Sequence, residues 1–145
     1  MKDKKIKKIS PESYQDRTYR QHAAEGLVSS FVSVKETDLH IMASRNVEPE
    51  ADDLVHQYRN QLENYIGVHP EFLTSLVPLD VDPLAPPIVK QMLQAARSAE
   101  VGPMAAVAGA IAEFVGKGLL GHGVDEVIVE NGGDIFMNRK QECIS

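Results

Sequence analysis

Two regions with the alternating pattern of β-strands enclose three segments with the 3.6-residue periodicity of amphipathic helices. Residues 27–35 alternate valine with polar residues, and residues 39–44 resume the alternation after a polar break at 36–38. Residues 126–137 form a second pair of extended segments, joined by the turn sequence Asn131-Gly132-Gly133. Two hairpins around a helical middle predict an α+β fold, with one antiparallel sheet packed against about three helices.

Residues that favour the start or the end of a helix flank the helical segments. Pro49 precedes acidic residues that favour the first turn of a helix, and Gly67 is suited to the position just after the last turn. A third segment with the apolar periodicity of a helix begins at Pro103, and Gly121 is suited to the position just after its last turn. The predicted helices are residues 49–66, 86–97 and 103–119.

Five prolines in residues 69–87 predict a connection between the first two helices, with a short turn around 72–76. Residues 17–21 are also strand-like, and residues 1–12 form a basic tail that we expect to be flexible. No internal repeat or linker divides the sequence. We therefore expect residues 1–145 to form a single domain.

Charge and composition exclude several classes of protein. The 15 basic and 21 acidic residues give a net charge of −6, which argues against nucleic acid as the main partner. The longest uncharged stretch, residues 101–112, is shorter than the about 20 residues of a membrane-spanning helix, so no membrane partner is expected. The single cysteine, Cys143, excludes an internal disulfide and a cysteine-based metal cage. We expect a cytoplasmic protein.

Small side chains crowd the first half of the third predicted helix. They are Gly102, Ala105, Ala106, Gly109, Ala110 and Ala112. Small residues allow a flat ligand to approach the backbone closely, and the start of a helix can receive a phosphate group. The alternative, favoured by this signal alone, is a helix pressed tightly against a sheet.

The turn Asn131-Gly132-Gly133-Asp134 is the second unusual segment. A hairpin needs only one or two such residues, so consecutive glycines suggest close approach of the backbone to a ligand, with Asn131 and Asp134 as polar contacts. The alternative is that the glycines serve only the turn.

Familiar catalytic patterns are missing from the sequence. The five histidines have no metal-ligand spacing, so each is expected on the surface or half-buried, and no metal site is predicted. The serines have no evident base, and no GxSxG or Walker loop occurs. Generic hydrolase chemistry is therefore not expected.

Residues 101–113 (Val-Gly-Pro-Met-Ala-Ala-Val-Ala-Gly-Ala-Ile-Ala-Glu) and 129–135 (Val-Glu-Asn-Gly-Gly-Asp-Ile) together resemble the ApbE-like superfamily, whose named activity is FAD:protein FMN transferase. Residues 36–39 and 69–72 look like its branch of uncharacterised cytoplasmic proteins. The resemblance covers the chain from about Arg17 onward. It implies the ApbE-like fold and a nucleotide-shaped cleft between the glycine-bearing helix and the Gly-Gly-Asp turn.

The resemblance implies FAD or FMN as cofactor. A lysine stands before the helix glycine in the transferases, whereas Ala108 stands there in this chain, so the catalytic residues are not assigned. The implied cofactor-binding residues are Gly102, Met104, Ala105, Ala108, Gly109, Asn131, Gly132, Gly133 and Asp134.

The resemblance also implies that the chain matches an amino-terminal portion of the superfamily fold, incomplete at its carboxyl end. The Mg²⁺ ligands of the transferases would lie beyond it, so Mg²⁺ is not expected in this chain alone. An unfinished sheet has an open edge, so we expect a homo-oligomer or completion by a missing segment.

Three functions remain open at this level. The first is a flavin- or nucleotide-binding protein with the cleft described above. The second is a non-catalytic structural or interaction module whose glycines serve packing and turns. The third is an FMN transferase that acts only together with the missing carboxyl-terminal segment.

Overall fold

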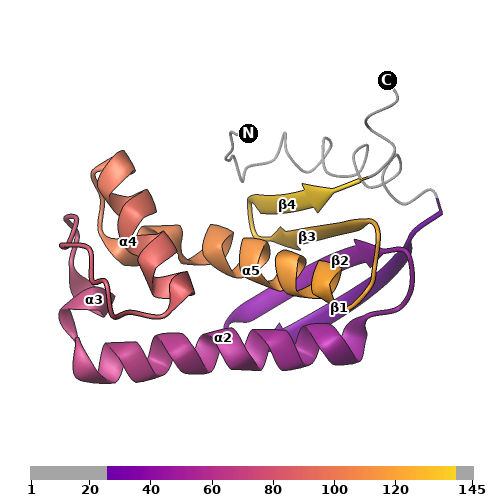
Figure 1. Cartoon of the computed structure of the whole chain (residues 1–145), viewed down its shortest axis with the longest axis horizontal. Coiled ribbons are helices and arrows are strands. Elements are labelled where there is room, and N and C mark those ends of the chain that lie inside the picture. The colour runs from indigo at the N-terminus through magenta and orange to yellow at the C-terminus, as the bar shows by residue number, and fades with distance from the viewer. Residues whose placement is uncertain (1–25, 140–145) are drawn as a thin grey trace.

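The described strands form one antiparallel sheet in the order β1-β2-β3-β4, which confirms the predicted α+β class (Figure 1). The structure is a computed structural model and describes residues 26–139. The predicted strand at 17–21 and the basic tail lie outside this range. The strands are β1 (Val28–Val34), β2 (Thr37–Ala43), β3 (Val127–Asn131) and β4 (Asp134–Asn138).

Pairing of β2 with β3 joins the early hairpin to the late hairpin. Leu39 lies opposite Asn131 and Ile41 lies opposite Val129, so strands from distant parts of the sequence become the two central strands. In β1, Val32 and Val34 are buried and Phe31 is exposed, as the alternation predicts. The predicted polar break is too long, because β2 already begins at Thr37.

The three predicted helices are present, with differences at their ends. The first continues through Gly67 and ends where the His69 N–H bonds to the Tyr65 carbonyl, so the predicted stop at Gly67 is wrong. The third starts as a 3₁₀ turn at Pro103 before it becomes α-helical. The helical elements are α2 (Glu48–Val68), α3 (Glu71–Thr74), α4 (Pro87–Ala99), η1 (Pro103–Ala106) and α5 (Val107–Gly121).

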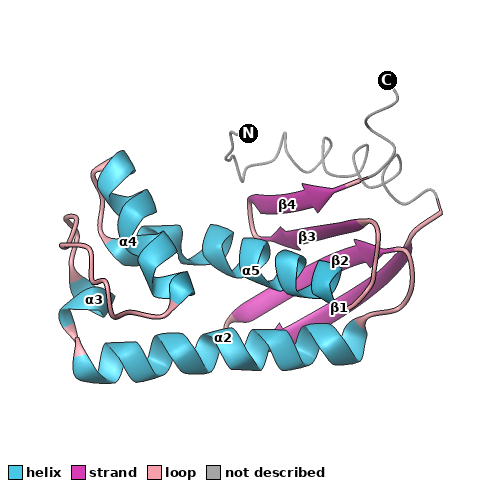
Figure 2. Ribbon diagram, in the orientation of Figure 1, coloured by secondary structure: helices cyan, strands magenta, loops and turns pink. Residues whose placement is uncertain are grey.

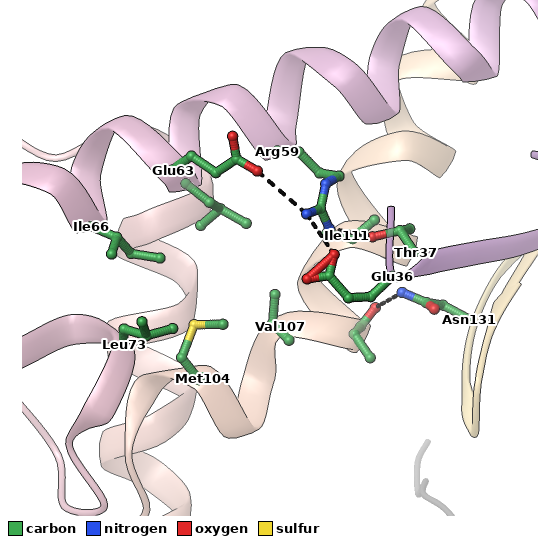
Figure 3. A pocket seen from close by; sticks show the side chains of 12 residues that line it. Glu36, Thr37, Arg59, Glu63, Ile66, Leu73, Met104, Val107, Ile111 and Asn131 are labelled. Atoms are coloured by element: carbon green, nitrogen blue, oxygen red, sulfur yellow. Dashed lines mark hydrogen bonds and ion pairs between the residues drawn. The ribbon is translucent and has the colours of Figure 1, made fainter. Parts of the chain in front are cut away.

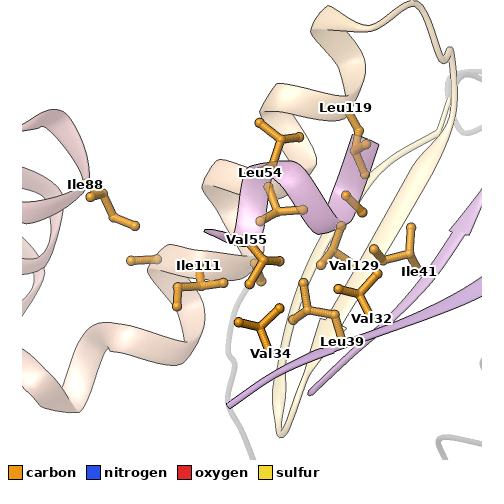
Figure 4. Close-up of a cluster of buried hydrophobic side chains, with 14 of the residues drawn as sticks. Val32, Val34, Leu39, Ile41, Leu54, Val55, Ile88, Ile111, Leu119 and Val129 are labelled. Atoms are coloured by element: carbon orange, nitrogen blue, oxygen red, sulfur yellow. The ribbon is translucent and has the colours of Figure 1, made fainter. Parts of the chain in front are cut away.

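Helices α2 and α5 cover one face of the sheet, whereas α3 and α4 lie beyond its end (Figure 2). Helix α5 packs on β3 and β4, α2 packs on β1, and the two helices contact each other. Aliphatic side chains from the two layers interlock there, including Val32, Ile41, Val55 and Leu119, all at most 4% exposed (Figure 4). Phe114 of α5 meets Tyr58 of α2 edge-on, and Gly118 of α5 lies against Leu54, so the second half of α5 packs on the first half of α2.

Helix α5 is apolar for a structural reason. By length and composition, the segment Pro103–Gly121 could cross a membrane. The same composition suits a helix at the centre of a domain, and α5 contacts β3, β4, α2 and α4. Within the described residues, α5 is therefore a helix packed between the sheet and the other helices.

The proline-rich connection is attached to α2 through Tyr65. Its hydroxyl donates a hydrogen bond of 2.7 Å to Asp82 Oδ2, and burial together with this bond raises the pKa of Tyr65 to about 12. Tyr65 also contacts the Phe72 ring edge-on and stacks on His69. These contacts hold α3, which occupies the position of the predicted short turn.

Candidate functional site

The small-residue start of α5 and the turn between β3 and β4 lie side by side. Asn131 Nδ2 donates a hydrogen bond of 3.1 Å to the Ala108 carbonyl oxygen. A Cβ built on Gly109 would lie 3.5 Å from Asp134 Oδ1. The two segments singled out by the sequence are therefore neighbours, and side chains of the hairpin contact the helix directly.

Other candidate residues surround this junction without facing a common space. Gly102 lies against the loop after α3, where an added Cβ would be 1.8 Å from the Ser75 carbonyl oxygen, so its missing side chain permits close backbone packing. Ala105 is exposed. Gly132 has φ +62 in the hairpin turn, a conformation that glycine adopts without strain, and Gly133 completes the turn.

A cavity of about 450 Å³ opens between α2 and the start of α5, and we call it the α2–α5 pocket (Figure 3). One wall belongs to α2 and the other to η1 and α5, while the β1–β2 turn and α3 lie at its ends. Three candidate residues, Met104, Ala108 and Asn131, line it. Its lining residues are Glu36, Thr37, Arg59, Leu62, Glu63, Ile66, Leu73, Met104, Val107, Ala108, Ile111 and Asn131.

Arg59 is the centre of the polar cluster in this pocket. Its Nη1 donates to Thr37 Oγ1 at 2.7 Å, and its Nη2 donates to Glu36 Oε1 at 3.0 Å. The same Nη2 lies 3.4 Å from Glu63 Oε2. The Arg59 side chain is only 16% exposed, and its buried Nε has no hydrogen-bond partner among the described residues. A buried N–H without a partner costs free energy, which an acceptor on a ligand would recover.

Neighbouring groups set the ionisation state of Glu36 at this end of the pocket. A backbone hydrogen bond and the Arg59 guanidinium lower the pKa of the Glu36 carboxyl, so Glu36 stays a carboxylate partner of Arg59 below its usual titration range. Glu63 supplies a second acidic side chain. Lys35 Nζ lies 3.3 Å from Glu63 Oε2, so two cations and two carboxylates balance at this end. No net positive charge remains to attract a phosphate, and the end suits a neutral acceptor.

The sequence analysis missed Arg59, although a signal for it exists. Arg59 falls on the apolar stripe of α2, between Val55 and Leu62 at helical spacing. A charged residue on a buried stripe normally has a specific partner. Its partners, Glu36 and Thr37, come from the β1–β2 turn, so only the packing of α2 on β1 reveals the cluster.

No metal centre accompanies the pocket within residues 26–139. In that part of the chain, no group of three or more His, Cys, Asp or Glu side chains is placed to hold a metal ion. The described lining of the pocket offers apolar contact, hydrogen bonding and charge.

Substitution by alanine should have opposite effects on the stability of the fold at two glycines of α5. In Gly109→Ala the new Cβ makes only an ordinary contact, so the better helix propensity of alanine should stabilise the fold by about 1 kcal/mol. In Gly116→Ala the Cβ would lie 2.1 Å from the Phe136 ring, which should destabilise by about 1–3 kcal/mol. Thermal unfolding measures both. A loss of stability in Gly109→Ala as large as that in Gly116→Ala would contradict the described spacing at Asp134.

Comparisons with known proteins give a consistent family. A family model described as AbpE bacteria matches residues 20–144. A UPF0280 protein of Methanococcus aeolicus is 38% identical over 119 residues, which are 81% of this chain and 48% of the relative. One from Methanocaldococcus jannaschii is 41% identical over 114 residues, 78% of this chain and 46% of the relative. One from Methanothrix thermoacetophila is 52% identical over 79 residues, 53% of this chain and 33% of the relative.

These findings correct the resemblance drawn from the sequence. The family model and the relatives point to the UPF0280 proteins and not to the ApbE-like FAD:protein FMN transferases, so that assignment is wrong. The chain spans less than half the length of each of these relatives. The names of the relatives state no substrate, so the geometry of the pocket has to carry any functional argument.

Proposed function

The chain belongs to the family of the AbpE bacteria model and the UPF0280 proteins, and we propose that its α2–α5 pocket binds a flat, mainly apolar small molecule with hydrogen-bond acceptors along one edge. The flavin ring system of FMN or FAD is the first candidate. It combines an apolar benzenoid end with a pyrimidine end that carries carbonyl acceptors. The buried Arg59 Nε without a partner, at the edge of an apolar cavity, carries the proposal.

The size and lining of the pocket support this class of ligand. Small-molecule sites usually have about 300–1,000 Å³ and apolar walls with a few polar groups, and the volume of about 450 Å³ falls within that range. Leu62 and Ile66 of α2 and Val107 and Ile111 of α5 all line the pocket, so a planar ring between the two helices would contact aliphatic side chains from both (Figure 3). Ala108 keeps the space between the walls open.

The charged groups around Arg59 decide how a flavin would be oriented in the pocket. Glu36 pairs with Arg59, and Glu63 pairs with both Arg59 and Lys35, so this end has no net positive charge to hold a phosphate. A flavin would place the carbonyl edge of its ring toward Arg59 and leave its ribityl phosphate outside the pocket. Riboflavin, which has no phosphate, should then bind at least as tightly as FMN.

Filling the pocket should abolish flavin binding. In Ala108→Leu the larger side chain occupies the space between the walls, and we expect roughly tenfold or greater loss of affinity for riboflavin and FMN. Ala105→Leu is the matched control, because the same change on the exposed neighbouring turn leaves the pocket open. Quenching of flavin fluorescence on titration with protein gives the dissociation constants, and the melting temperature reports ligand stabilisation independently.

A second variant separates the polar contact from the shape of the pocket. Arg59→Lys keeps a positive charge but removes the planar group that carries Nε, so it should weaken riboflavin binding while circular dichroism remains unchanged. Absence of binding for riboflavin, FMN and FAD at saturating concentration would overturn the proposal. Equal affinity of the Ala108→Leu and Ala105→Leu proteins would instead place the flavin outside this pocket. The expected cytoplasmic location and self-association remain separate predictions.

A further inference from the structure

The sheet face opposite α2 and α5 carries a row of aromatic and polar side chains. In the strand register, Phe31 of β1 lies opposite His40 of β2, and His40 lies opposite Glu130 of β3. Their sequence neighbours Val32 and Val129 are buried in the core on the helix side, so this row projects from the other face. The row is independent of the α2–α5 pocket.

His40 connects a serine to a carboxylate across three strands. Its Nε2 lies 3.1 Å from Ser29 Oγ, and its Nδ1 lies 3.3 Å from Glu130 Oε1. Because a carboxylate only accepts hydrogen bonds, Nδ1 of the neutral imidazole carries the proton and donates a hydrogen bond to Glu130. Nε2 then has a free electron pair, which accepts the hydrogen bond from the Ser29 hydroxyl. The order is nucleophile, base and orienting carboxylate.

Burial increases from the serine through the histidine to the carboxylate. The Glu130 side chain is 6% exposed and that of His40 is 12% exposed, whereas Ser29 is on the surface. The Phe31 ring stacks on the imidazole, with centroids 4.5 Å apart and planes 9° apart. The base and the carboxylate are therefore held in place, while the hydroxyl can meet a molecule from solvent.

We propose that Ser29 is a nucleophile activated by His40 and Glu130, and that it attacks small carboxylic esters. A cavity of about 390 Å³ lies beside His40 and Glu130, on the side of the imidazole away from Ser29, and an ester bound there would have to extend past the ring to reach the Ser29 hydroxyl. Its lining residues are Phe31, Ser33, Asp38, Leu39, His40, Glu130 and Gly132. A reactive serine on the sheet face opposite the helices would be a second activity, distinct from ligand binding between the helices.

The reaction balances with water as the only co-reactant. Ser29 Oγ bonds to the ester carbonyl carbon while its proton passes to His40 Nε2. The C–O bond to the alcohol breaks, and the alcohol leaves with that proton. Water then attacks the acyl-serine and gives its proton to Nε2, and Ser29 Oγ takes the proton back as the carboxylic acid departs. Glu130 accepts the Nδ1–H bond throughout and orients the ring.

Ser33 provides an internal comparison on the same strand. Its hydroxyl points to the same face but donates to Asp38 Oδ1 at 2.6 Å. Ser33 therefore has a carboxylate partner and no imidazole among the described contacts, and a serine of this kind is not activated in the same way. Ser29 is therefore expected to be reactive, and Ser33, four residues further along the strand, is not.

The test uses a fluorophosphonate probe, which forms a bond to a nucleophilic serine oxygen and releases fluoride. The folded chain should be labelled on Ser29 and not on Ser33, as mapped by tandem mass spectrometry. Ser29→Ala should abolish labelling, and Ser33→Ala should leave its rate unchanged. His40→Gln should slow labelling by about a hundredfold, the lower end of the usual effect of a general base. Hydrolysis of p-nitrophenyl acetate should fall in parallel.

Glu130→Gln tests the orienting role and should slow labelling by roughly tenfold or more, because the amide no longer fixes the tautomer of His40. Circular dichroism checks that each variant is folded, and Ser29→Ala, an exposed change, remains decisive if Glu130→Gln is not. No label on Ser29 of the folded wild-type chain would overturn the proposal. So would a labelling rate that His40→Gln leaves unchanged, or equal labelling of Ser33.

Discussion

The Gly102→Ala protein is expected to be less stable than the wild type by at least about 3 kcal/mol, the upper end of the usual range for overpacking. Gly102 has φ −75 and ψ 159, a conformation that alanine adopts freely, so backbone strain does not contribute. The expected loss of stability comes instead from steric overlap. An added Cβ would lie 1.8 Å from the Ser75 carbonyl oxygen and 3.1 Å from Leu76 Cα, and neither backbone atom can rotate away.

Equilibrium unfolding in urea measures this effect as a lower midpoint at unchanged slope. Gly67→Ala is the matched control, because open space surrounds Gly67 on α2 and alanine should stabilise that helix by about 1 kcal/mol. A Gly102→Ala protein with the wild-type midpoint would show that η1 and the loop after α3 separate freely. The close packing described for this junction would then be incorrect.

Loss of the Phe72 ring is the second large effect that we expect, about 3–5 kcal/mol for Phe72→Ala. Phe72 is 0% exposed and meets Tyr65 edge-on, with ring centroids 5.2 Å apart. Helix α3 has four residues, too few to be stable without tertiary contacts. The ring therefore anchors α3, and because Leu73 of α3 lines the α2–α5 pocket, flavin affinity should also fall.

The Phe72 prediction has its own controls. Leu76→Ala, at a site 87% exposed, should change stability by no more than about 0.5 kcal/mol. Phe72→Leu should lose less than Phe72→Ala, since a branched aliphatic side chain refills part of the space. Urea midpoints of the three proteins give the comparison. Similar midpoints for Phe72→Ala and Leu76→Ala would show that α3 is held by other contacts.

The glycines of the motifs that suggested a superfamily have roles in packing and in a turn. Small residues in α5 allow it to lie close to its neighbours: Gly116 faces the Phe136 ring and Gly109 faces Asp134. Gly132 supplies the positive φ of a hairpin turn. Many unrelated folds need a tight helix and a tight turn, so these two short motifs did not identify the family. The match over residues 20–144 did.

The local pattern of the chain was sufficient to predict its elements. Alternation in β1, the stripes of α2 and α4, and the glycine turn between β3 and β4 are properties of neighbouring residues, and each appears where it was expected. The α+β class follows from their order. The local pattern did not give the exact ends: α2 runs through Gly67 to Val68, next to the residues where Tyr65 contacts Phe72 and Asp82 of the following segment.

Both candidate sites, in contrast, were created by tertiary structure. Arg59 meets Glu36 only because α2 packs on β1, and His40 meets Glu130, 90 positions away, only because β2 pairs with β3 in one register. A shift of that register by one residue would place the His40 partner on the opposite face of the sheet. Periodicity records which side of an element is buried. It carries no information on which distant element covers that side, and the packing of the whole core decides this.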